Sequence, residues 1–375
     1  MRIVNVPLGQ RSYLIKVGAA LLETIGRECA RTQLGKRCAI ISDRNVTPLF
    51  GKRVKESLAR AGFESEIVVV PPGETSKSVI WVEKCYDELA AHRLERKSFI
   101  VALGGGVVGD LAGFVAATYL RGIPFIQVPT TLLAQVDSSV GGKVGVNLRA
   151  GKNLVGAFYQ PRLVLCDLDT LRTLPVREYR AGLAEVIKYG IIYDAELFER
   201  LEREMEKLLG RDAKVLAGII ARCCEIKAEV VAQDETESGL RAILNFGHTI
   251  GHALEAISHY GKYLHGEAIS IGQIAAAKLS REILGLAGQD TERIEKLFHR
   301  AGLPTNISLN QGQHKKLFAA MKLDKKVSAG EIKFVLARRI GEVEFGQKVP
   351  AASIKRILSL PITHHASRIT SHARR

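Results

Sequence analysis

The sequence lacks long apolar runs and has few aromatic residues. Aromatic side chains make up 6% of the 375 residues, and no window reaches the roughly 18 consecutive apolar residues that a membrane helix needs. The first residues also lack the apolar core of a secretory signal peptide. With 46% hydrophobic and 25% charged residues, the composition is that of an ordinary globular protein. It excludes a disordered chain, a collagen-like repeat and a coiled-coil rod, and we expect no contact with a membrane.

The six cysteines include no Cys-x-x-Cys pair. Most of them lie among apolar neighbours, which is typical of reduced, partly buried thiols, so we predict a cytoplasmic protein. The adjacent Cys223 and Cys224 lie on a helical stretch and would suit a metal or redox pair, but packing in the core is the interpretation that we favour.

Positive charge is in clear excess. The chain has 54 Lys and Arg against 39 Asp and Glu, which gives a net charge of +15. Nucleic-acid binding would explain this balance, but zinc-finger spacing, an RNA-recognition signature and a long basic run are all missing. We therefore interpret the charge as a basic surface with anion-binding pockets and predict no nucleic-acid partner.

Short apolar segments alternate with helix-length segments in the first half of the chain. The apolar segments are aliphatic or β-branched and are bounded by glycine or proline, as in strands buried on both faces. The predicted strands are 37–43, 67–70, 98–103, 124–128 and 163–166, with helices such as 54–61 and 78–92 between them. This alternation predicts an α/β fold with a parallel sheet covered by helices.

Strand patterns almost vanish after residue 175. Apolar residues at helical spacing predict helices at 194–209, 215–231, 249–257, 268–284 and 291–301, and one β-like stretch remains at 332–337. We therefore predict a parallel-sheet domain over 1–172, a mainly α-helical domain over 173–360, and a loose basic tail over 361–375.

A glycine-rich motif, Gly104-x-Gly106-x-x-Gly109, joins a predicted strand to a predicted helix. Glycine there lets the backbone approach a pyrophosphate, and the helix N-terminus supplies N–H donors, as in a Rossmann-like dinucleotide site. The match is imperfect, because Pro129-Thr130-Thr131 stands where an acid would bind the ribose. Asp43, which ends an earlier strand, is the candidate ribose partner, and Asp110 follows the motif directly.

Two Gly-Lys units follow, at Gly142-Lys143 and Gly151-Lys152. Glycine lets the chain come close to an anion, and lysine supplies a mobile positive charge. The first unit is not a P-loop, because the spacing and the hydroxyl residue after the lysine are missing. We favour anion binding over two solvated loop lysines.

Histidines indicate a metal site in the second half. His248 and His252 are one helical turn apart, His265 follows in Leu264-His-Gly-Glu267, and Glu185 offers a carboxylate. Two histidines and a carboxylate leave a position open for substrate, which suits catalysis at a metal. The spacing leaves open whether His248 pairs with His252 or with His265, and histidines with purely structural roles remain the alternative.

Seven stretches in one order resemble the 3-dehydroquinate synthase family of sugar-phosphate cyclases. They are Pro72-Gly-Glu-Thr-Ser-Lys77, Gly104-Gly-Gly-Val-Val-Gly-Asp110, the segment from Pro129 to Lys143, Gly151-Lys-Asn153, Gly182-Leu-Ala-Glu-Val-Ile-Lys188, Asn245-Phe-Gly-His-Thr-Ile-Gly-His252 and Leu264-His-Gly-Glu267. The resemblance implies an NAD-binding Rossmann-like domain, a helical domain and an active site between them. It also implies conversion of 3-deoxy-D-arabino-heptulosonate 7-phosphate to 3-dehydroquinate and phosphate in the shikimate pathway, by a homodimer.

The resemblance also implies roles for single residues. Glu185, His248 and His265 become the ligands of Zn²⁺ or Co²⁺. The implied NAD contacts are Asp43, Gly73, Glu74, Lys77, Gly105, Gly106, Val107, Asp110, Thr130, Thr131, Asp137, Ser138, Lys143, Lys152, Thr170, Thr173 and Glu178. The implied catalytic and substrate residues are Arg121, Lys143, Lys152, Asn153, Lys188, Lys227, Arg241, Asn245, His252 and one of Lys325 or Lys326.

Three other functions compete with this prediction. A related cyclase would act on a different sugar phosphate, but Lys227 and Arg241 suit a substrate with a carboxylate. A metal- and NAD-dependent polyol dehydrogenase would give net reduction of NAD⁺, whereas a cyclase gives none. A catalytically silent nucleic-acid-binding protein would not need the three implied metal ligands.

Overall fold

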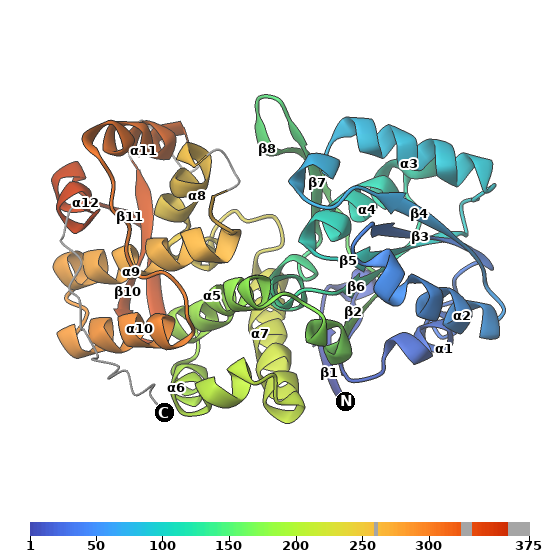
Figure 1. Ribbon diagram of the computed structural model, residues 1–375, viewed down its shortest axis with the longest axis horizontal. Coiled ribbons are helices and arrows are strands. Elements are labelled where there is room, and N and C mark those ends of the chain that lie inside the picture. Colours follow the sequence, from blue (N-terminus) through green and yellow to red (C-terminus); the bar gives the residue numbers. More distant parts are fainter. Residues whose placement is uncertain (259–261, 324–331, 359–375) are drawn as a thin grey trace, which may run out of the picture.

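A computed structural model describes residues 1–258, 262–323 and 332–358. Figure 1 shows two lobes, an α/β lobe that carries the N-terminus and a helical lobe that ends the described chain. Among the described residues, no helix combines the length and the apolar character that crossing a membrane requires. The mixed α/β architecture with a parallel sheet is the predicted fold class.

The α/β lobe is built on a sheet with the order β1-β2-β9-β6-β5-β3-β4. Its strands are β1 (Arg2–Val6), β2 (Tyr13–Gly18), β3 (Arg37–Asp43), β4 (Glu64–Val70), β5 (Phe99–Gly104), β6 (Phe125–Pro129) and β9 (Leu163–Asp167). The predicted strands are confirmed and all run parallel, whereas β1 pairs antiparallel with β2 and extends the sheet at an edge that the sequence did not predict.

Helices cover both faces of this sheet. They are α1 (Ile25–Ala30), α2 (Lys52–Arg60), α3 (Val79–Ala91) and α4 (Gly106–Thr118). Alternate residues of β3 enter opposite cores: Ala39 and Ile41 pack with α3 and α4, while Cys38 and Ile40 pack with α1 and α2. This two-sided burial explains why the parallel strands read as continuous apolar runs.

A hairpin, β7 (Lys143–Leu148) with β8 (Gly151–Phe158), projects from the α/β lobe in Figure 1. The lysines of both Gly-Lys units therefore lie on paired strands rather than in separate loops. Lys143 opens β7 and Lys152 lies near the start of β8, so the pairing fixes both backbones at the side of the lobe that faces the helices.

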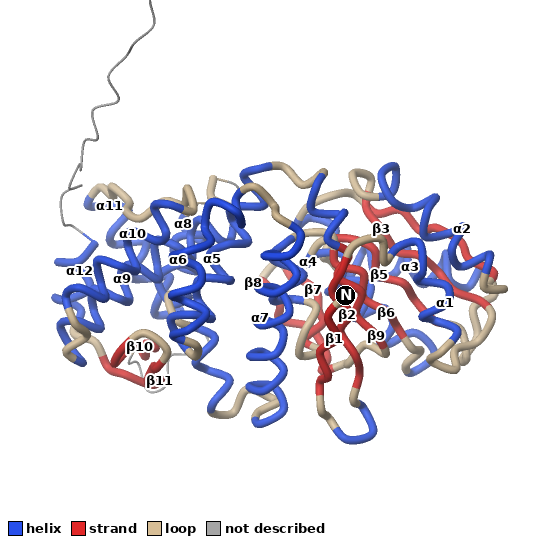
Figure 2. The backbone as a smooth tube through the Cα atoms, turned by 90° about the horizontal axis from the view of Figure 1, so that it is seen from below, coloured by secondary structure: helices blue, strands red, loops and turns tan. Residues whose placement is uncertain are grey.

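The helical lobe begins after the last strand of the main sheet. Its elements are α5 (Val176–Ile192), α6 (Ala195–Leu209), α7 (Ala213–Gln233), α8 (His248–Ile257), α9 (His265–Leu284), α10 (Gly288–Arg300), α11 (Gln311–Leu323), α12 (Ala351–Leu358), and a hairpin of β10 (Lys333–Arg339) with β11 (Glu342–Lys348). The predicted helices and the strand near 332–337 are confirmed. Helix α7 packs on β1 and β2 (Figure 2), and one hydrophobic cluster runs from the sheet into the helices. All six cysteines are buried and free, which confirms core packing for Cys223 and Cys224.

Arg211 fastens the connection between the lobes. It follows α6 in the left-handed region with φ 58°, and its guanidinium donates to the carbonyl oxygens of Leu171, Arg172 and Leu174, the last at 2.7 Å. The guanidinium also lies 4.7 Å from the centre of the Tyr179 ring. These contacts hold the segment between β9 and α5 against the end of α6.

Arg211→Ala is expected to lower the free energy of unfolding by about 3 kcal/mol, because carbonyl groups lose charged donors that the smaller side chain cannot replace. Urea unfolding followed by circular dichroism measures the change. Arg172→Ala is the matched control, since the Arg172 side chain is 79% exposed and, among the described residues, pairs only with Asp169, at 3.5 Å. Equal stability of the two variants would contradict the role of Arg211.

Candidate active site

The parallel strands end at one edge of the sheet, where many predicted cofactor residues gather. Asp43 ends β3, Gly104 ends β5, Thr130 follows β6 and Thr170 lies shortly after β9. The Asp43 carboxylate accepts hydrogen bonds from the backbone N–H groups of the next turn at 2.8 and 3.0 Å. Open parallel sheets bind ligands at this edge, so the position suits a dinucleotide.

The glycine-rich turn lies at the centre of that edge. A Cβ atom on Gly104 would come within 2.6 Å of the Val108 side chain, and one on Gly106 within 3.0 Å of the Ser138 hydroxyl. Gly105, which precedes α4, has no side chain that could cap the first turn of the helix. The turn thus combines close packing with the N–H donors of a helix N-terminus, which fits a bound phosphate group.

The hairpin β7–β8 is tied to the same edge. Lys77 forms an ion pair with Asp110, and the backbone carbonyl of Lys77 accepts from the Asn147 N–H at 2.8 Å. The Asn147 amide donates to Glu74 at 2.7 Å, and Lys152 Nζ lies 3.9 Å from the same carboxylate. Burial raises the pKa of Asp110, although the charge of Lys77 lowers it.

The three implied metal ligands come together in the helical lobe. Glu185 lies on α5, while His248 and His265 are the first residues of α8 and α9. Glu185 Oε1 lies 3.7 Å from His248 Nε2 and 3.8 Å from His265 Nε2, too far for hydrogen bonds. This oxygen is buried without a hydrogen-bond partner among the described residues, while the other oxygen accepts from Lys188. A buried carboxylate oxygen facing two ring nitrogens fits a bound divalent ion.

The other ring nitrogens of the two histidines point to acceptors. His248 Nδ1 lies 3.1 Å from the Phe246 carbonyl, and His265 Nδ1 lies 3.3 Å from Glu255 Oε2. Both contacts favour the proton on Nδ1 and leave Nε2 directed at Glu185. Burial lowers the pKa of His265, but Glu185 and Glu255 outweigh it and raise the pKa to about 10, so a metal ion must displace a proton from this ring.

His252 lies beside this group. Its ring centre is 5.1 Å from that of His248 and 6.0 Å from that of His265. With Glu255 and His265 it forms a second set whose ligand atoms lie within 4.8 Å of one another. The helical spacing of His248 and His252 thus puts both rings on one face of α8. The ring that faces Glu185 together with His248, however, is that of His265.

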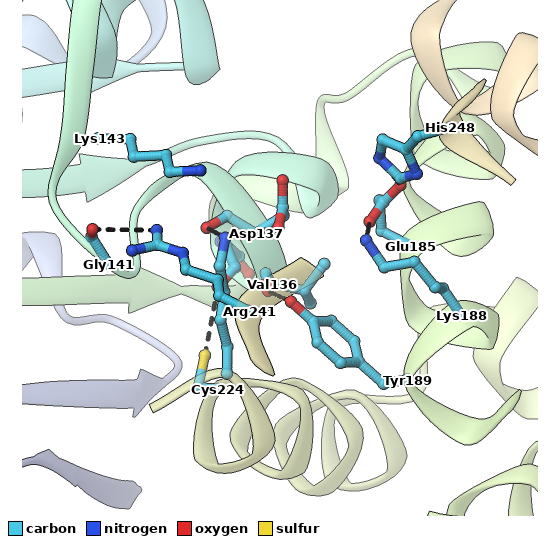
Figure 3. Close-up of polar contacts among 12 residues, drawn as sticks. Val136, Asp137, Gly141, Lys143, Glu185, Lys188, Tyr189, Cys224, Arg241 and His248 are labelled. Carbon is cyan, nitrogen blue, oxygen red and sulfur yellow. Dashed lines mark hydrogen bonds and ion pairs between the residues drawn. The ribbon is translucent and has the colours of Figure 1, made fainter. Parts of the chain in front are cut away.

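Asp137 lies between the cofactor edge and the metal group. Its carboxylate accepts a hydrogen bond from Lys227 at 2.5 Å. Figure 3 shows Asp137 between Gly141 and the pair of Glu185 and His248. Burial raises the pKa of Asp137, but Lys227, Lys188 and His265 together lower it below its ordinary range. Asp137 in turn contributes to the raised pKa of Asp110. Asp137 therefore interacts electrostatically with Asp110 at the cofactor edge and with Lys188 and His265 at the metal group.

Further cations line the side of the α/β lobe. Arg241 donates to the Gly141 carbonyl at 3.1 Å, and Lys143 pairs with Glu237. Glu237 also accepts from Asn245 at 2.9 Å. Figure 3 shows the Lys143 side chain directed toward Asp137 and the Arg241 guanidinium directed toward Gly141. This concentration of positive charge suits an anionic substrate.

The remaining implied cofactor residues surround the edge of the sheet. Thr131 caps the turn that contains Ser138 by accepting from the Ala134 N–H at 3.1 Å. Thr173 donates to the Thr170 carbonyl at 3.2 Å, and Glu178 lies in the first turn of α5. Gly73 takes φ 88° before Glu74, and Val107 lies in the first turn of α4.

The structure does not place every implied substrate residue in the site. Arg121 is exposed in the turn after α4, and within the described chain it has no hydrogen bond or ion pair with the other implied residues. Lys325 and Lys326 lie outside the described residues, as does the predicted tail 361–375. Asn153, in contrast, is held on β8 by its N–H, which donates to Asn147 at 2.9 Å.

Three residues that connect the implied site residues were not predicted from the sequence. Asn147 joins the hairpin to Glu74, Glu237 joins Lys143 to Asn245, and Glu255 contacts His265. Only Glu255 had a recognisable pattern, because it lies one helical turn after His252 on the same face of α8.

Asp234 holds the loop that carries Glu237 and Arg241. Its carboxylate accepts from the backbone N–H groups of Ser238, Gly239 and Arg241 at 2.8 to 2.9 Å. Burial raises the pKa of Asp234, but these hydrogen bonds outweigh it and lower the pKa to about 2.

The pH dependence of unfolding tests this carboxylate. Because the folded-state pKa lies below the ordinary value of 3.8, the stabilisation is complete above that value and is lost as the pH falls through the folded-state pKa. The stability advantage of the wild type over Asp234→Asn is therefore expected to shrink between about pH 5 and about pH 2. Urea unfolding at both ends measures it, and a constant advantage would contradict the assignment.

Comparisons with known proteins agree with this geometry. Models of the N-terminal and C-terminal parts of 3-dehydroquinate synthase match residues 67–181 and 182–327. A 3-dehydroquinate synthase of Desulforamulus reducens is 51% identical over 96% of this chain and 100% of the relative. The chain belongs to the 3-dehydroquinate synthase family. A family member from Thermodesulfovibrio yellowstonii is 48% identical over the same shares of both chains. The predicted resemblance is confirmed.

Solved structures of related cyclases share the fold of this 3-dehydroquinate synthase family member. A 2-deoxy-scyllo-inosose synthase complexed with carbaglucose-6-phosphate, NAD⁺ and Co²⁺ has a TM-score of 0.88 and 28% identity, covering 96% of this chain and 99% of that one. The 2-epi-5-epi-valiolone synthase of Streptomyces hygroscopicus subsp. jinggangensis, with NAD⁺ and Zn²⁺, has a TM-score of 0.85 and 29% identity, covering 92% and 95%. A probable glycerol dehydrogenase of Sinorhizobium meliloti, at 16% identity over 92% and 94% with a TM-score of 0.60, shares the fold alone.

Proposed function

We propose that this chain converts 3-deoxy-D-arabino-heptulosonate 7-phosphate to 3-dehydroquinate and phosphate. The reaction is a transient oxidation, elimination of phosphate, re-reduction and intramolecular aldol closure, which makes the enzyme a phosphate-eliminating carbon–oxygen lyase. The observation that carries the proposal is the buried Glu185 oxygen, which faces two histidine nitrogens beside the carboxyl edge of a parallel sheet. The family relationship supports the same substrate.

Glu185, His248 and His265 would hold the metal. A bound Zn²⁺ or Co²⁺ supplies a Lewis acid for the hydroxyl that is oxidised. Neighbouring groups orient two of these ligands: the Phe246 carbonyl contacts His248, and Lys188 donates to the second oxygen of Glu185. The donor set of two nitrogens and one oxygen leaves room for a substrate oxygen.

The carboxyl edge of the sheet would hold NAD. Bound NAD would supply reversible hydride chemistry and would not be consumed. Asp43 lies at the end of β3, where a ribose hydroxyl would meet it, and the first turn of α4 would receive the pyrophosphate. Lys77, fixed by Asp110, keeps a positive charge beside that turn.

Different cations would contact the two charged groups of the substrate. Lys143 and Lys152 on the hairpin are positioned to hold the phosphate, while Lys227 and Arg241 suit the carboxylate. Charge-assisted hydrogen bonds to these groups orient the substrate and exclude water. Glu237 and Glu255, which pair with Lys143 and Lys152, keep these side chains in place before an anion arrives.

Phosphate release is the direct test. The chain, loaded with Co²⁺ or Zn²⁺ and a catalytic amount of NAD⁺, is expected to release one phosphate per heptulosonate phosphate without net NADH. Stoichiometric NADH would identify a dehydrogenase instead. Release from a hexose phosphate, with none from the heptulosonate phosphate, would identify a different cyclase.

We also propose two domains with stated boundaries, a cytoplasmic location and a homodimer. An NAD-binding domain over 1–172 and a metal- and substrate-binding domain over 173–360 agree with the change from sheet to helices after β9. Free, buried cysteines suit a reducing cytoplasm. A homodimer is proposed from the resemblance, and analytical ultracentrifugation tests it.

A further inference from the structure

We propose that Glu255 is a positioning residue for the reaction: its carboxylate fixes the ring of the metal ligand His265 and holds Lys152 of the opposite lobe beside the metal centre. The inference rests on the proposed metal site. It adds a function to a residue that is neither one of the three ligands nor one of the implied substrate contacts.

The contact with His265 carries the first half of the inference. Glu255 Oε2 lies 3.3 Å from His265 Nδ1, and the Glu255 side chain is only 12% exposed. A carboxylate accepts but does not donate, so the proton stays on Nδ1 and the lone pair of Nε2 points toward Glu185. A negative partner also makes the ring a stronger metal ligand.

The second oxygen of Glu255 faces a different cation. Glu255 Oε1 lies 3.8 Å from Lys152 Nζ, which itself lies 3.9 Å from Glu74. Glu255 belongs to α8 in the helical lobe, whereas Lys152 and Glu74 belong to the α/β lobe. One carboxylate therefore joins the metal ligand to the lysine that we assign to the substrate phosphate.

Helix geometry explains why this position reaches both partners. His248, His252 and Glu255 follow one another on one face of α8, and His265 opens α9 where it packs against α8. A glutamine here would still accept the hydrogen bond from Nδ1. It would neither strengthen the ligand nor attract Lys152, so charge and shape can be separated by substitution.

Metal affinity of the metal-free full chain, measured with Co²⁺ alone in competition with a chromophoric chelator, tests the first half. Glu255→Ala is expected to weaken Co²⁺ binding by about 10- to 100-fold, and Glu255→Gln by less, since the amide keeps the acceptor but loses the charge. A change in the visible absorption of bound Co²⁺ should accompany the loss, because the ring of His265 reorients.

The proposed contact between Glu255 and Lys152 is tested by Lys152→Ala, which should leave the Co²⁺ affinity unchanged and raise KM for the heptulosonate phosphate. Both Glu255 variants should raise the same KM. Glu202→Gln is the matched control, because Glu202 lies on α6 and pairs with Arg293 of α10 at 2.7 Å. This variant should change neither the Co²⁺ affinity nor KM. Unchanged Co²⁺ affinity in the Glu255 variants would overturn the inference.

Folding and the metal site itself are checked separately. Circular dichroism and the thermal midpoint of the metal-free variants show whether they fold. If Glu255→Ala does not fold, the nearly isosteric Glu255→Gln tests the inference by itself. Glu185→Gln must lose Co²⁺ if the proposed metal site is correct. Normal Co²⁺ binding by Glu185→Gln would refute that site, which is a different outcome from a failure confined to Glu255.

Discussion

Glu185→Gln is expected to lower kcat/KM by about 10³-fold, equivalent to ~4 kcal/mol of transition-state stabilisation. The amide removes the negative charge from the buried oxygen that faces His248 and His265 at 3.7 and 3.8 Å. It also leaves Lys188, whose side chain is 1% exposed, without its carboxylate partner. Metal content by mass spectrometry and phosphate release, each measured before and after added Co²⁺, check the prediction.

Glu28→Gln is the matched control for that variant. Glu28 is another buried carboxylate paired with a buried lysine, Lys16, but it joins α1 to β2 away from the metal group. Its substitution should cost stability and leave metal content and turnover intact. If Glu185→Gln kept its metal and its activity, the metal centre assigned here would be wrong.

His252→Ala is expected to slow turnover by about 10²-fold or more while the metal remains bound. The ring lies within 5.1 and 6.0 Å, centre to centre, of two metal ligands, which suits a group that carries a proton from the coordinated substrate hydroxyl. An imidazole has one nitrogen that can accept a proton and one that can donate it, so the ring can pass that proton on. Phosphate release and metal content by mass spectrometry measure the change.

The control for His252 is His92→Ala, since His92 lies on the surface beside α3 and contacts only Glu88 in the described chain. Its turnover should equal that of the wild type. Co²⁺ affinity separates the proton-carrying role from ligation: a His252→Ala variant that loses the metal would make His252 a ligand instead. Turnover unchanged with the metal in place would refute both roles.

The parallel strands could be predicted because their apolar runs are buried on both faces. The predicted range 37–43 matches β3, and the segments near 67–70, 98–103, 124–128 and 163–166 match β4, β5, β6 and β9 within a few residues. β1 was missed because its residues alternate between exposed and buried at an edge of the sheet. The hairpin β7–β8 was missed because its glycines and lysines resemble loop residues, and only pairing between the strands makes them extended.

The sequence by itself determined which functional groups are available: a glycine-rich turn after a strand, lysines beside glycines, and histidines with a carboxylate. It could place His248 and His252 on one helical face, since local periodicity fixes that relation. The family resemblance implied the set of Glu185, His248 and His265, but local spacing did not. The tertiary structure brings His265, from the start of another helix, to His248 and Glu185, and it alone placed Glu255 in contact with His265. Contacts between distant segments depend on how helices pack, and no local pattern encodes that arrangement.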